Sequence, residues 1–522
     1  PVENLSEYSV AEIAAKLQNE LSPEKLKEEY KSDYFLSPRG PEGLGEALKT
    51  DFSLRKDDYI SNLELFYNPD KIHSHYLWSI FRAIQDNINL LSISDVQIII
   101  NLFEKISEYD DEEAIIWTRK VERDFLADWI EVHKTITDIL KLILVTDKFK
   151  SNLTDSDKEK IVKIIKYLFG IKASPRKNEE ENLKNQDLFS IAINSVRGIA
   201  YECFINYLYL GDNKIDDDCK EIFEKALDDD SLAVKFMIGH YFASVYFRDK
   251  EWIMLKTTEA IKRDSDSFVA FMEGYMSNSL YEELFAKMRP NYELVINQVR
   301  SGLPERKYFK PVEELLATQL ALAFVHFNFD EEDSLFKSFV ALDNEQAHSE
   351  FIKFIGQSYF FQDKSQNKMT KEMMQKSVLF WEKILEKKIP LNKKCLADFS
   401  FWINAKEEYI SDEKASVLVL ETLKQSSGDW SWEYGLFGRL EEFAKINPKH
   451  TLEIIRLYYL SSDSDRMNPE RKYPLMRVEN ETYKALEIIY SYSESKENAR
   501  DLISKLIEVG GTSFWPLEDL VK

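Results

Sequence analysis

Apolar residues recur at the spacing of an α-helix along almost the whole chain, and this periodicity limits the fold more than any other feature. The clearest case predicts one long amphipathic helix from Trp117 to Leu144, whose apolar face consists of Val121, Phe125, Trp129, Val132, Ile136 and Ile139. There is no sustained alternation of apolar and polar residues, the pattern of a half-buried strand. The sequence therefore predicts an all-α protein.

Shorter helical segments follow one another to the end of the chain. Pro290 is expected to separate helices at 279–288 and 290–299, or to kink them if they form one helix, and a further helix is predicted at 393–406. The 522 residues exceed one compact core, so we expect about three domains or one elongated array. The 15 glycines and 14 prolines are too few for the turns of a sandwich or barrel.

The net charge of −23 argues against two classes of partner. Nucleic acids are disfavoured because contacts to phosphates need a dense cationic surface, and an acidic surface also repels anionic membranes. No run of 18 uncharged apolar residues occurs, so no transmembrane span is expected. We therefore expect a soluble protein whose partners are other proteins.

The three cysteines indicate a reducing compartment. Their number is odd and their spacing is wide, which excludes a C-x-x-C zinc or redox motif; they are Cys203, Cys219 and Cys395. Reduced thiols and a cytoplasmic location are the plain interpretation. The sequence starts at Pro1 without an initiator methionine and without the basic and apolar regions of a signal peptide, so we expect a segment of a longer protein.

A local repeat suggests how the helices are organised. Ser195-Val196-Arg197 aligns with Ala233-Val234-Lys235 at an offset of about 38 residues, and Asp228-Asp229-Asp230 precedes the second copy. In such a repeat the aspartate caps a helix, and a basic residue pairs with the aspartate of a neighbouring unit. This pattern predicts an α-solenoid of antiparallel helix pairs, similar to HEAT repeats, with a long concave face.

Changes in composition give the predicted domain boundaries. Residues 1–175 form an N-terminal helical domain, and the polar, proline-marked stretch at 176–187 is a linker. Residues 188–460 carry the HEAT-like repeats, and residues 461–522 form C-terminal capping helices.

No motif in the sequence predicts catalysis, so we expect no catalytic residue, no cofactor and no metal. A P-loop, a Gly-x-Ser-x-Gly elbow and His-Glu-x-x-His are all missing. His73 and His75 are conceivable metal ligands, but helix capping or surface placement fits them better because no third ligand is evident. The acidic stretch at 212–218 lacks the glycine and the final glutamate of an EF-hand, and is read as a capping loop.

Two groups of residues are candidates for binding a protein partner. Lysines outnumber acidic residues in one stretch of this acidic chain. The stretch is either a surface for an acidic partner or an ordinary solvated face. Its candidate binding residues are Lys387, Lys388, Lys393 and Lys394. Aromatic residues at a loop-to-helix junction are either binding hot spots or helix packing; they are Trp430, Trp432 and Tyr434.

Several short phrases in this order resemble a known family. They include GLGEAL at 43–48, DDSLAVK at 229–235, FMEGY at 271–275, FWEK at 380–383 and ARDLI at 499–503. Together they resemble the C-terminal helical-repeat region of bacterial anti-phage STAND NTPases of the Avs type and related sirtuin-linked defence proteins. In that family an effector and an NTPase precede a helical sensor that recognises a phage protein and drives assembly.

The resemblance implies a non-catalytic sensor that binds a phage structural or packaging protein, with oligomerisation possible in the full-length protein. Two alternatives remain open on the residues themselves. One is a general scaffold for host protein complexes. The other is an enzyme with an unrecognised site, which would need a deep pocket with converging polar groups.

Overall fold

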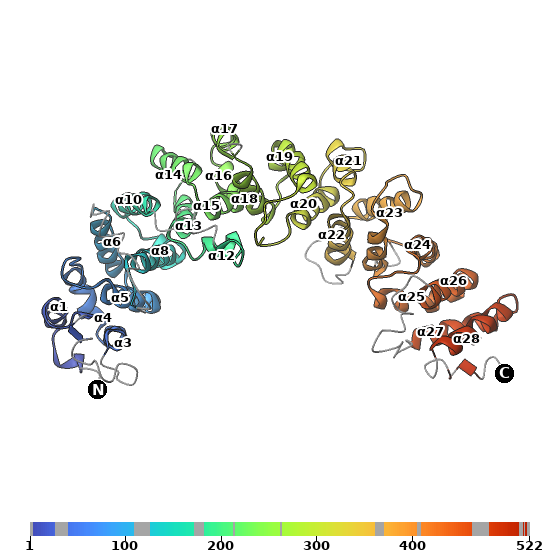
Figure 1. Ribbon diagram of the computed structural model, residues 1–522, viewed down its shortest axis with the longest axis horizontal. Helices are drawn as coiled ribbons and strands as arrows, with labels where there is room; N and C mark the ends of the chain where they lie inside the picture. The colour runs from blue at the N-terminus through green and yellow to red at the C-terminus, as the bar shows by residue number, and fades with distance from the viewer. Residues whose placement is uncertain are drawn as a thin grey trace. The chain divides into compact units, whose positions relative to one another are not determined.

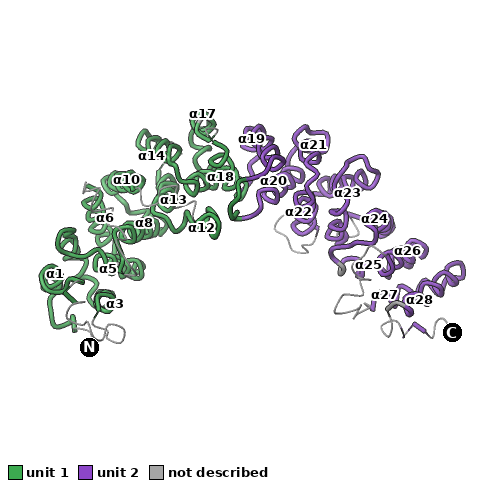
Figure 2. Tube along the Cα trace, viewed as in Figure 1, with its two compact units in different colours: residues 1–278, 304–309 green, residues 279–303, 310–522 purple. Residues whose placement is uncertain are grey.

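The computed structural model describes residues 4–23, 25–26, 40–108, 126–171, 182–211, 215–261, 264–360, 370–404, 409–461, 480–510, 515 and 517–518. Every regular element in these ranges is a helix, so the predicted all-α class is confirmed. None of the helices described is long and apolar enough to cross a membrane. The chain forms two compact units: unit 1 comprises residues 1–278 and 304–309, and unit 2 comprises residues 279–303 and 310–522 (Figure 2).

Unit 1 has two rows of helices, in which each helix packs mainly on the next member of its own row. The first row, called the α5 row, consists of α3 (Pro41–Leu54), α5 (Ser74–Asp86), α8 (Trp129–Val145), α13 (Val196–Leu208), α15 (Leu232–His240) and α18 (Ser265–Met276). The second, the α6 row, consists of α4 (Lys56–Ser61), α6 (Ile93–Ser107), α10 (Asp155–Gly170), α14 (Asp217–Asp228) and α17 (Lys250–Ile261). Figure 1 shows α3, α5 and α8 on one side of the unit and α6, α10, α14 and α17 on the other.

Shorter elements complete unit 1. They are η1 (Leu5–Glu7), α1 (Val10–Asn19), η2 (Leu63–Phe66), η3 (Ile88–Leu90), α9 (Asp147–Lys150), α12 (Leu188–Ala192) and α16 (Phe242–Tyr246). Of these, α12 packs on both α13 and α15 and therefore lies over the α5 row.

Unit 2 follows the same plan. Its first row, the α22 row, consists of α20 (Val312–His326), α22 (Glu345–Ile355), η5 (Lys393–Asn404), α25 (Glu433–Ile446) and α27 (Asn480–Ser491). Its second row consists of α23 (Lys371–Leu385), α24 (Asp412–Gln425), α26 (Pro448–Leu460) and α28 (Lys496–Gly510). The elements α19 (Glu282–Ser301) and α21 (Ser334–Val340) pack together, and η4 (Gly356–Phe360) is a π-helical turn that follows α22 (Figure 1).

Polar N-caps explain where the helices of unit 1 begin. Ser92 and Thr154 each form a capping box with an aspartate three residues later, which satisfies backbone N–H groups at both helix starts. Ser195, Ser231 and Asp264 cap three consecutive members of the α5 row. A cap of this kind stabilises a helix by about 1 kcal/mol.

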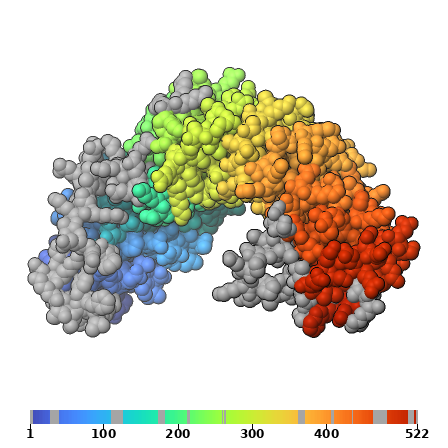
Figure 3. Space-filling model, turned by 45° about the vertical axis from the view of Figure 1, so that its right-hand side comes forward, coloured from blue at the N-terminus to red at the C-terminus, as the bar shows by residue number. Residues whose placement is uncertain are grey.

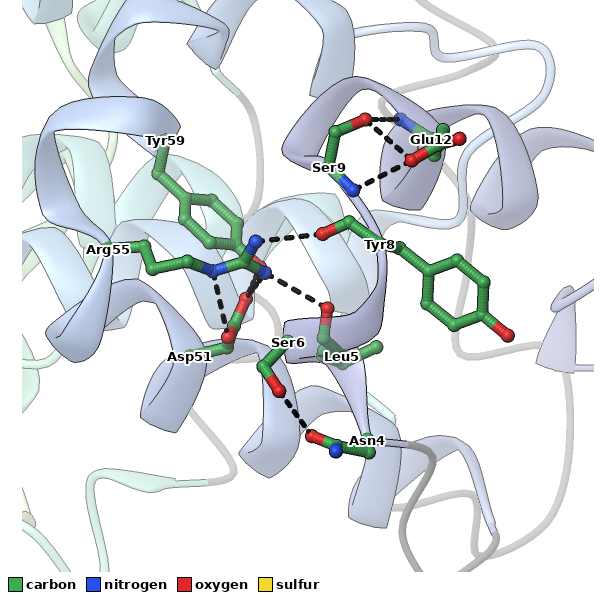
Figure 4. Close-up of polar contacts among 9 residues, drawn as sticks. All are labelled: Asn4, Leu5, Ser6, Tyr8, Ser9, Glu12, Asp51, Arg55 and Tyr59. Atoms are coloured by element: carbon green, nitrogen blue, oxygen red, sulfur yellow. Dashed lines mark hydrogen bonds and ion pairs between the residues drawn. The ribbon is translucent and has the colours of Figure 1, made fainter.

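A part-buried arginine holds the first residues of the chain against α3 (Figure 4). Arg55 donates to the carbonyl oxygens of Tyr8 at 2.8 Å and Leu5 at 3.1 Å, and it also pairs with Asp51. The buried Tyr59 hydroxyl donates to Asp51 at 2.7 Å, and burial raises the pKa of Tyr59. The carboxylate of Asp51 therefore orients the arginine that fixes η1 and α1.

Ion pairs connect successive helices of the α6 row. Lys163 of α10 reaches Glu104 of α6 at 2.8 Å, and Lys166 reaches Glu221 of α14 at 2.6 Å. In the α5 row, Arg197 donates to Asp229 at 2.9 Å, so the predicted pairing of a repeat arginine with a neighbouring aspartate is confirmed. The helix caps Ser195 and Ser231 are 36 residues apart, so the repeat has an offset of 36 residues rather than the predicted 38 or so.

Aromatic side chains fill much of the core of unit 2. Phe324, Phe336, Phe351 and Phe380 form a cluster with ring centroids 5.0–6.0 Å apart. Rings at this separation gain from edge-to-face contact in addition to burial. The space-filling view shows side chains closing the gaps that the ribbon leaves between neighbouring helices (Figure 3).

Three sequence predictions need correction. The long helix predicted from Trp117 is wrong where it can be tested, because α8 begins at Trp129 behind its cap Asp128, while residues 109–125 lie outside the described ranges. Pro290 does not separate two helices, and the alternative of one helix is confirmed, since α19 is continuous around it. The helix predicted at 393–406 is present, but as the 3₁₀-helix η5. The predicted boundaries at 175–187 and 460–461 lie within the two units and stay predictions.

Candidate functional site

The predicted tryptophans lie between α24 and α25 and pack against η5. Trp430 is only 2% exposed, so its ring belongs to the core. Trp432 is half-buried, stacks on Phe401 with centroids 5.9 Å apart, and donates its backbone N–H to Ser400 Oγ at 2.9 Å. The side chain of Tyr434 lies outside the described part of the chain. Helix packing therefore accounts for Trp430, and partner binding by the group stays a prediction.

The four predicted lysines are all exposed at the turn between α23 and η5. Lys394 pairs with Glu345 at 3.0 Å and Lys388 pairs with Glu386 at 2.6 Å. Lys387 has a positive φ of 58° at the end of α23, and Lys393 begins η5. An acidic partner for this surface stays a prediction.

A buried carboxylate lies near these residues. Asp398 on η5 accepts hydrogen bonds from Ser349 at 2.6 Å and Ser431 at 2.7 Å, and Lys353 lies 3.6 Å away. Burial raises the pKa of Asp398, and these three neighbours oppose the rise. Each hydroxyl donates directly to the carboxylate, and no imidazole lies between them, so the geometry ties α22, η5 and residue 431 together rather than activating a nucleophile.

Three partly exposed rings form a second candidate site, on unit 1. Phe189 of α12 lies 5.3 Å from Phe309 and 5.9 Å from His240, measured between ring centroids. Beneath them, Phe236 of α15 is fully buried and stacks on His240 at 6.0 Å. Phe309 is 42% exposed, whereas Phe189 and His240 are half-buried. We call the rings of Phe189, His240 and Phe309 the aromatic platform.

The segment 304–309, called the strap, brings Phe309 to the platform. Its Arg306 side chain is 3% exposed and pairs at 2.6 Å with Glu273 of α18, which is fully buried. The other Glu273 oxygen accepts the backbone N–H of Phe309 at 2.7 Å. Lys307 adds a backbone bond of 2.7 Å to the carbonyl of Leu183, beside α12. One carboxylate thus fixes both the strap and the backbone that carries the exposed ring.

The charge on Glu273 depends on these partners. Burial raises the pKa of Glu273, while the positive charge of Arg306 and the Phe309 N–H oppose the rise, and Asp187 adds to it. The Arg306 guanidinium also lies over the Tyr308 ring, 4.1 Å from its centroid. A buried ion pair with several hydrogen bonds fixes geometry, because loss of either partner leaves an uncompensated charge.

Two glycines set the base of the platform. A Cβ at Gly239 of α15 would lie 2.0 Å from the Phe271 carbonyl oxygen, and a Cβ at Gly274 of α18 would lie 2.0 Å from that of Phe236. The two helices therefore approach backbone to backbone, which only glycine allows at these positions. This close approach fixes Phe236 under the platform and Glu273 beneath the strap.

His240 contributes an uncharged ring at neutral pH. Burial lowers the pKa of His240, and the carboxylate of Glu202 only partly opposes this. Its Nδ1 lies 3.1 Å from Ser277 Oγ, and its backbone carbonyl accepts from Asn278 Nδ2 at 2.5 Å. The exposed surface of the platform is therefore aromatic and carries no charge at neutral pH.

Residues considered for metal binding have other roles. The capping interpretation of His73 is confirmed, since its Nδ1 accepts the His75 N–H at 3.1 Å, and His75 is buried with the Ala127 N–H on its own Nδ1. Asp216 caps α14, the role predicted for the acidic stretch before that helix. No group of three or more potential metal ligands occurs among the residues that the structure describes.

The cysteines are unreactive where they lie. Cys203, Cys219 and Cys395 are buried and unpaired in disulfides, and burial raises the pKa of each thiol. A thiol held protonated in this way is a poor nucleophile at neutral pH.

Sequence reasoning did not predict the platform. Its rings come from positions 189, 240 and 309, and none belongs to a local motif. One signal was present: Glu273 is the single charged residue within the otherwise apolar stretch Phe268–Met276, so a buried partner was to be expected.

Comparisons with known proteins add no relative: no family model, no curated protein and no solved structure matches this chain.

Proposed function

We propose that this chain is a protein-recognition region and that unit 1 binds its partner through the aromatic platform. The observation that carries the proposal is the exposed Phe309 ring, fixed by a strap that the buried Arg306–Glu273 pair holds to α18. Exposed aromatic rings on a rigid base provide large contact area at little entropic cost, as in binding hot spots.

We further propose that the two rows of each unit form an α-solenoid of HEAT-like antiparallel helix pairs. Repeated caps at Ser195, Ser231 and Asp264 support this reading, as does the Arg197–Asp229 pair between neighbouring helices. Stacked repeats of this kind typically present an extended surface to a partner.

The resemblance to Avs-type defence proteins leads to the specific proposal of a sensor. In it, the chain lies in the bacterial cytoplasm, belongs to a larger anti-phage protein and recognises a phage structural or packaging protein. The exposed lysines of unit 2 would then supply a second contact, to acidic groups of the same partner.

The test uses the purified chain as bait in lysates of infected and uninfected bacteria, with bound proteins identified by mass spectrometry. Phe309→Ala is the informative variant, because it removes the ring but keeps the backbone N–H that bonds Glu273. Phe247→Ala is the matched control: Phe247 is 41% exposed and Phe309 is 42% exposed, but Phe247 lies beside α17.

We expect a phage protein to be retained from infected lysate only, and to be lost with Phe309→Ala but kept with Phe247→Ala. A host protein retained equally from both lysates would instead support the general scaffold. Retention of a phage protein by both variants alike would place the binding surface away from the platform.

A further inference from the structure

The apolar surface of unit 1 extends beyond the aromatic platform along α12. Phe189 and Ile193 are four residues apart and lie on one face of the chain there, and Ile193 is 40% exposed. The Phe189 ring contacts those of Phe309 and His240, so these rings join α12, α15 and the strap, and Ile193 lies one turn further along the chain. We call this group, the platform plus Ile193, the α12 patch.

Two lysines flank the α12 patch, one at each end of α12. Lys134 of α8 donates to Asn194 Oδ1 at 3.3 Å, just after the helix. Lys307 of the strap is exposed and donates to the carbonyl of Asn185 at 3.2 Å, just before it. Within the described ranges neither lysine forms an ion pair, so both ammonium groups contact neutral oxygens near an apolar surface.

Three carboxylates near the α12 patch already have partners within the unit. Asp187 caps α12 by accepting from the Ser190 N–H at 2.9 Å, and Glu273 is buried against Arg306. Glu202 pairs with Lys141 at 2.8 Å. Among the described residues a lysine without an ion pair therefore remains at each end of α12, with Asp138 near Lys134, although the chain as a whole carries −23.

We propose that the α12 patch binds an acidic segment of a partner protein, in which large apolar side chains lie between aspartates or glutamates. The apolar anchors pack on Phe189, Ile193 and Phe309, and the flanking carboxylates pair with Lys134 and Lys307. Such an arrangement combines an apolar core with a charged rim, the usual anatomy of a recognition surface. This inference rests on the proposed function and specifies its partner.

A displayed library of random 12-residue peptides, selected on the full chain, provides the test. Enriched peptides are synthesised with a fluorescent label and their binding is measured by anisotropy. We expect them to contain aromatic or branched apolar residues together with several aspartates or glutamates. Binding should weaken by about tenfold with Phe309→Ala, the range of a hot-spot truncation, and should be unchanged by Phe247→Ala.

The double variant Lys134→Gln/Lys307→Gln tests the charges separately from the rings. We expect it to weaken binding by about three- to tenfold at 50 mM salt and to remove most of the salt dependence. Both lysines lie at the surface, so this variant stays informative even if Phe309→Ala impairs folding. Thermal unfolding of each variant checks that the fold is intact.

The proposal is overturned if the enriched peptides are neutral or basic, if nothing is enriched, or if the lysine double variant binds as the wild type does. Its failure can be told from failure of the proposed function. Capture of a phage protein that depends on Phe309, but not on the lysines, would refute only the acidic chemistry of the partner.

Discussion

Gly239→Ala should destabilise the crossing of α15 and α18 despite improving helix propensity. The added Cβ would lie 2.0 Å from the Phe271 carbonyl oxygen and 2.8 Å from the Tyr275 nitrogen, both backbone atoms that cannot rotate away. The two helices must therefore separate, and overpacking of this kind costs about 1–3 kcal/mol. The gain of up to about 1 kcal/mol from alanine propensity offsets only part of it.

Gly438→Ala provides the matched control. Gly438 is an exposed helical glycine of α25, and a Cβ there would meet no atom within 4 Å. We therefore expect it to stabilise by about 0.5–1 kcal/mol, the normal effect of replacing glycine within a helix. The two substitutions are chemically identical and differ only in the space around the Cβ.

Hydrogen exchange read by mass spectrometry is the suitable assay, because a chain with two compact units does not give one two-state transition. We expect Gly239→Ala to speed exchange in α15, α18 and the strap, and to leave unit 2 unchanged. The shift of the urea midpoint adds the direction of the change in stability. Unchanged or slower exchange in α15 and α18 would refute the close backbone contact and, with it, the proposed base of the platform.

Three further predictions concern buried charges. Burial lowers the pKa of His133 to about 4 from 6.5, so the unfolded chain takes up a proton at a higher pH than the folded chain does. The stability that His133 contributes above pH 6.5 should therefore be lost as the pH falls toward 4, by about 3 kcal/mol in total. Between pH 7 and 5 the urea midpoint should fall more in the wild type than in His133→Gln, which keeps the loss caused by the other histidines whose pKa is lowered by burial; equal falls in the midpoint would refute this. Glu273→Gln should lower the stability of the fold by about 3–5 kcal/mol and speed exchange in the strap, because it leaves Arg306 buried without its partner. Adding Arg306→Met should recover much of that loss. No recovery would contradict the role of the two residues as a buried ion pair. Arg55→Met should speed hydrogen exchange in residues 4–19, at a cost in stability of about 2 kcal/mol. Lys49→Met should change little, because the pair that Lys49 forms with Glu46 is exposed. Equal effects of the two substitutions would contradict the role of Arg55.

Local features of the sequence predicted the all-α class, several helix starts and one contact between neighbouring helices. The starts of α6 and α10 are marked in the sequence by Ser92 and Thr154, each followed three residues later by an aspartate that completes a capping box. The Arg197–Asp229 pair was predictable because Arg197 belongs to one copy of a short repeat and Asp229 precedes the next copy. Signals of this kind depend only on neighbours in the sequence or on a repeated unit.

Other elements depend on tertiary packing that no local pattern contains. The residues of η5 have the periodicity of an ordinary helix, yet they form an unusually long 3₁₀-helix. A Cβ at Gly356 would lie 2.5 Å from the Cβ of Phe401, and Asp398 is tied to Ser349 and Ser431. These contacts act along the whole of η5, so its neighbours, rather than its own propensity, determine its geometry.

The aromatic platform shows why the candidate site was harder to predict than the fold. Its ring at position 309 is brought to those at 189 and 240 by a carboxylate on another helix, Glu273. A buried charge in an apolar helix is costly, so its presence already required a partner of opposite charge somewhere in the chain. The sequence offers many arginines and lysines for that role, and only the fold selects Arg306. Because the same carboxylate also holds the backbone of Phe309, a residue needed for burial also determines where an exposed ring is presented.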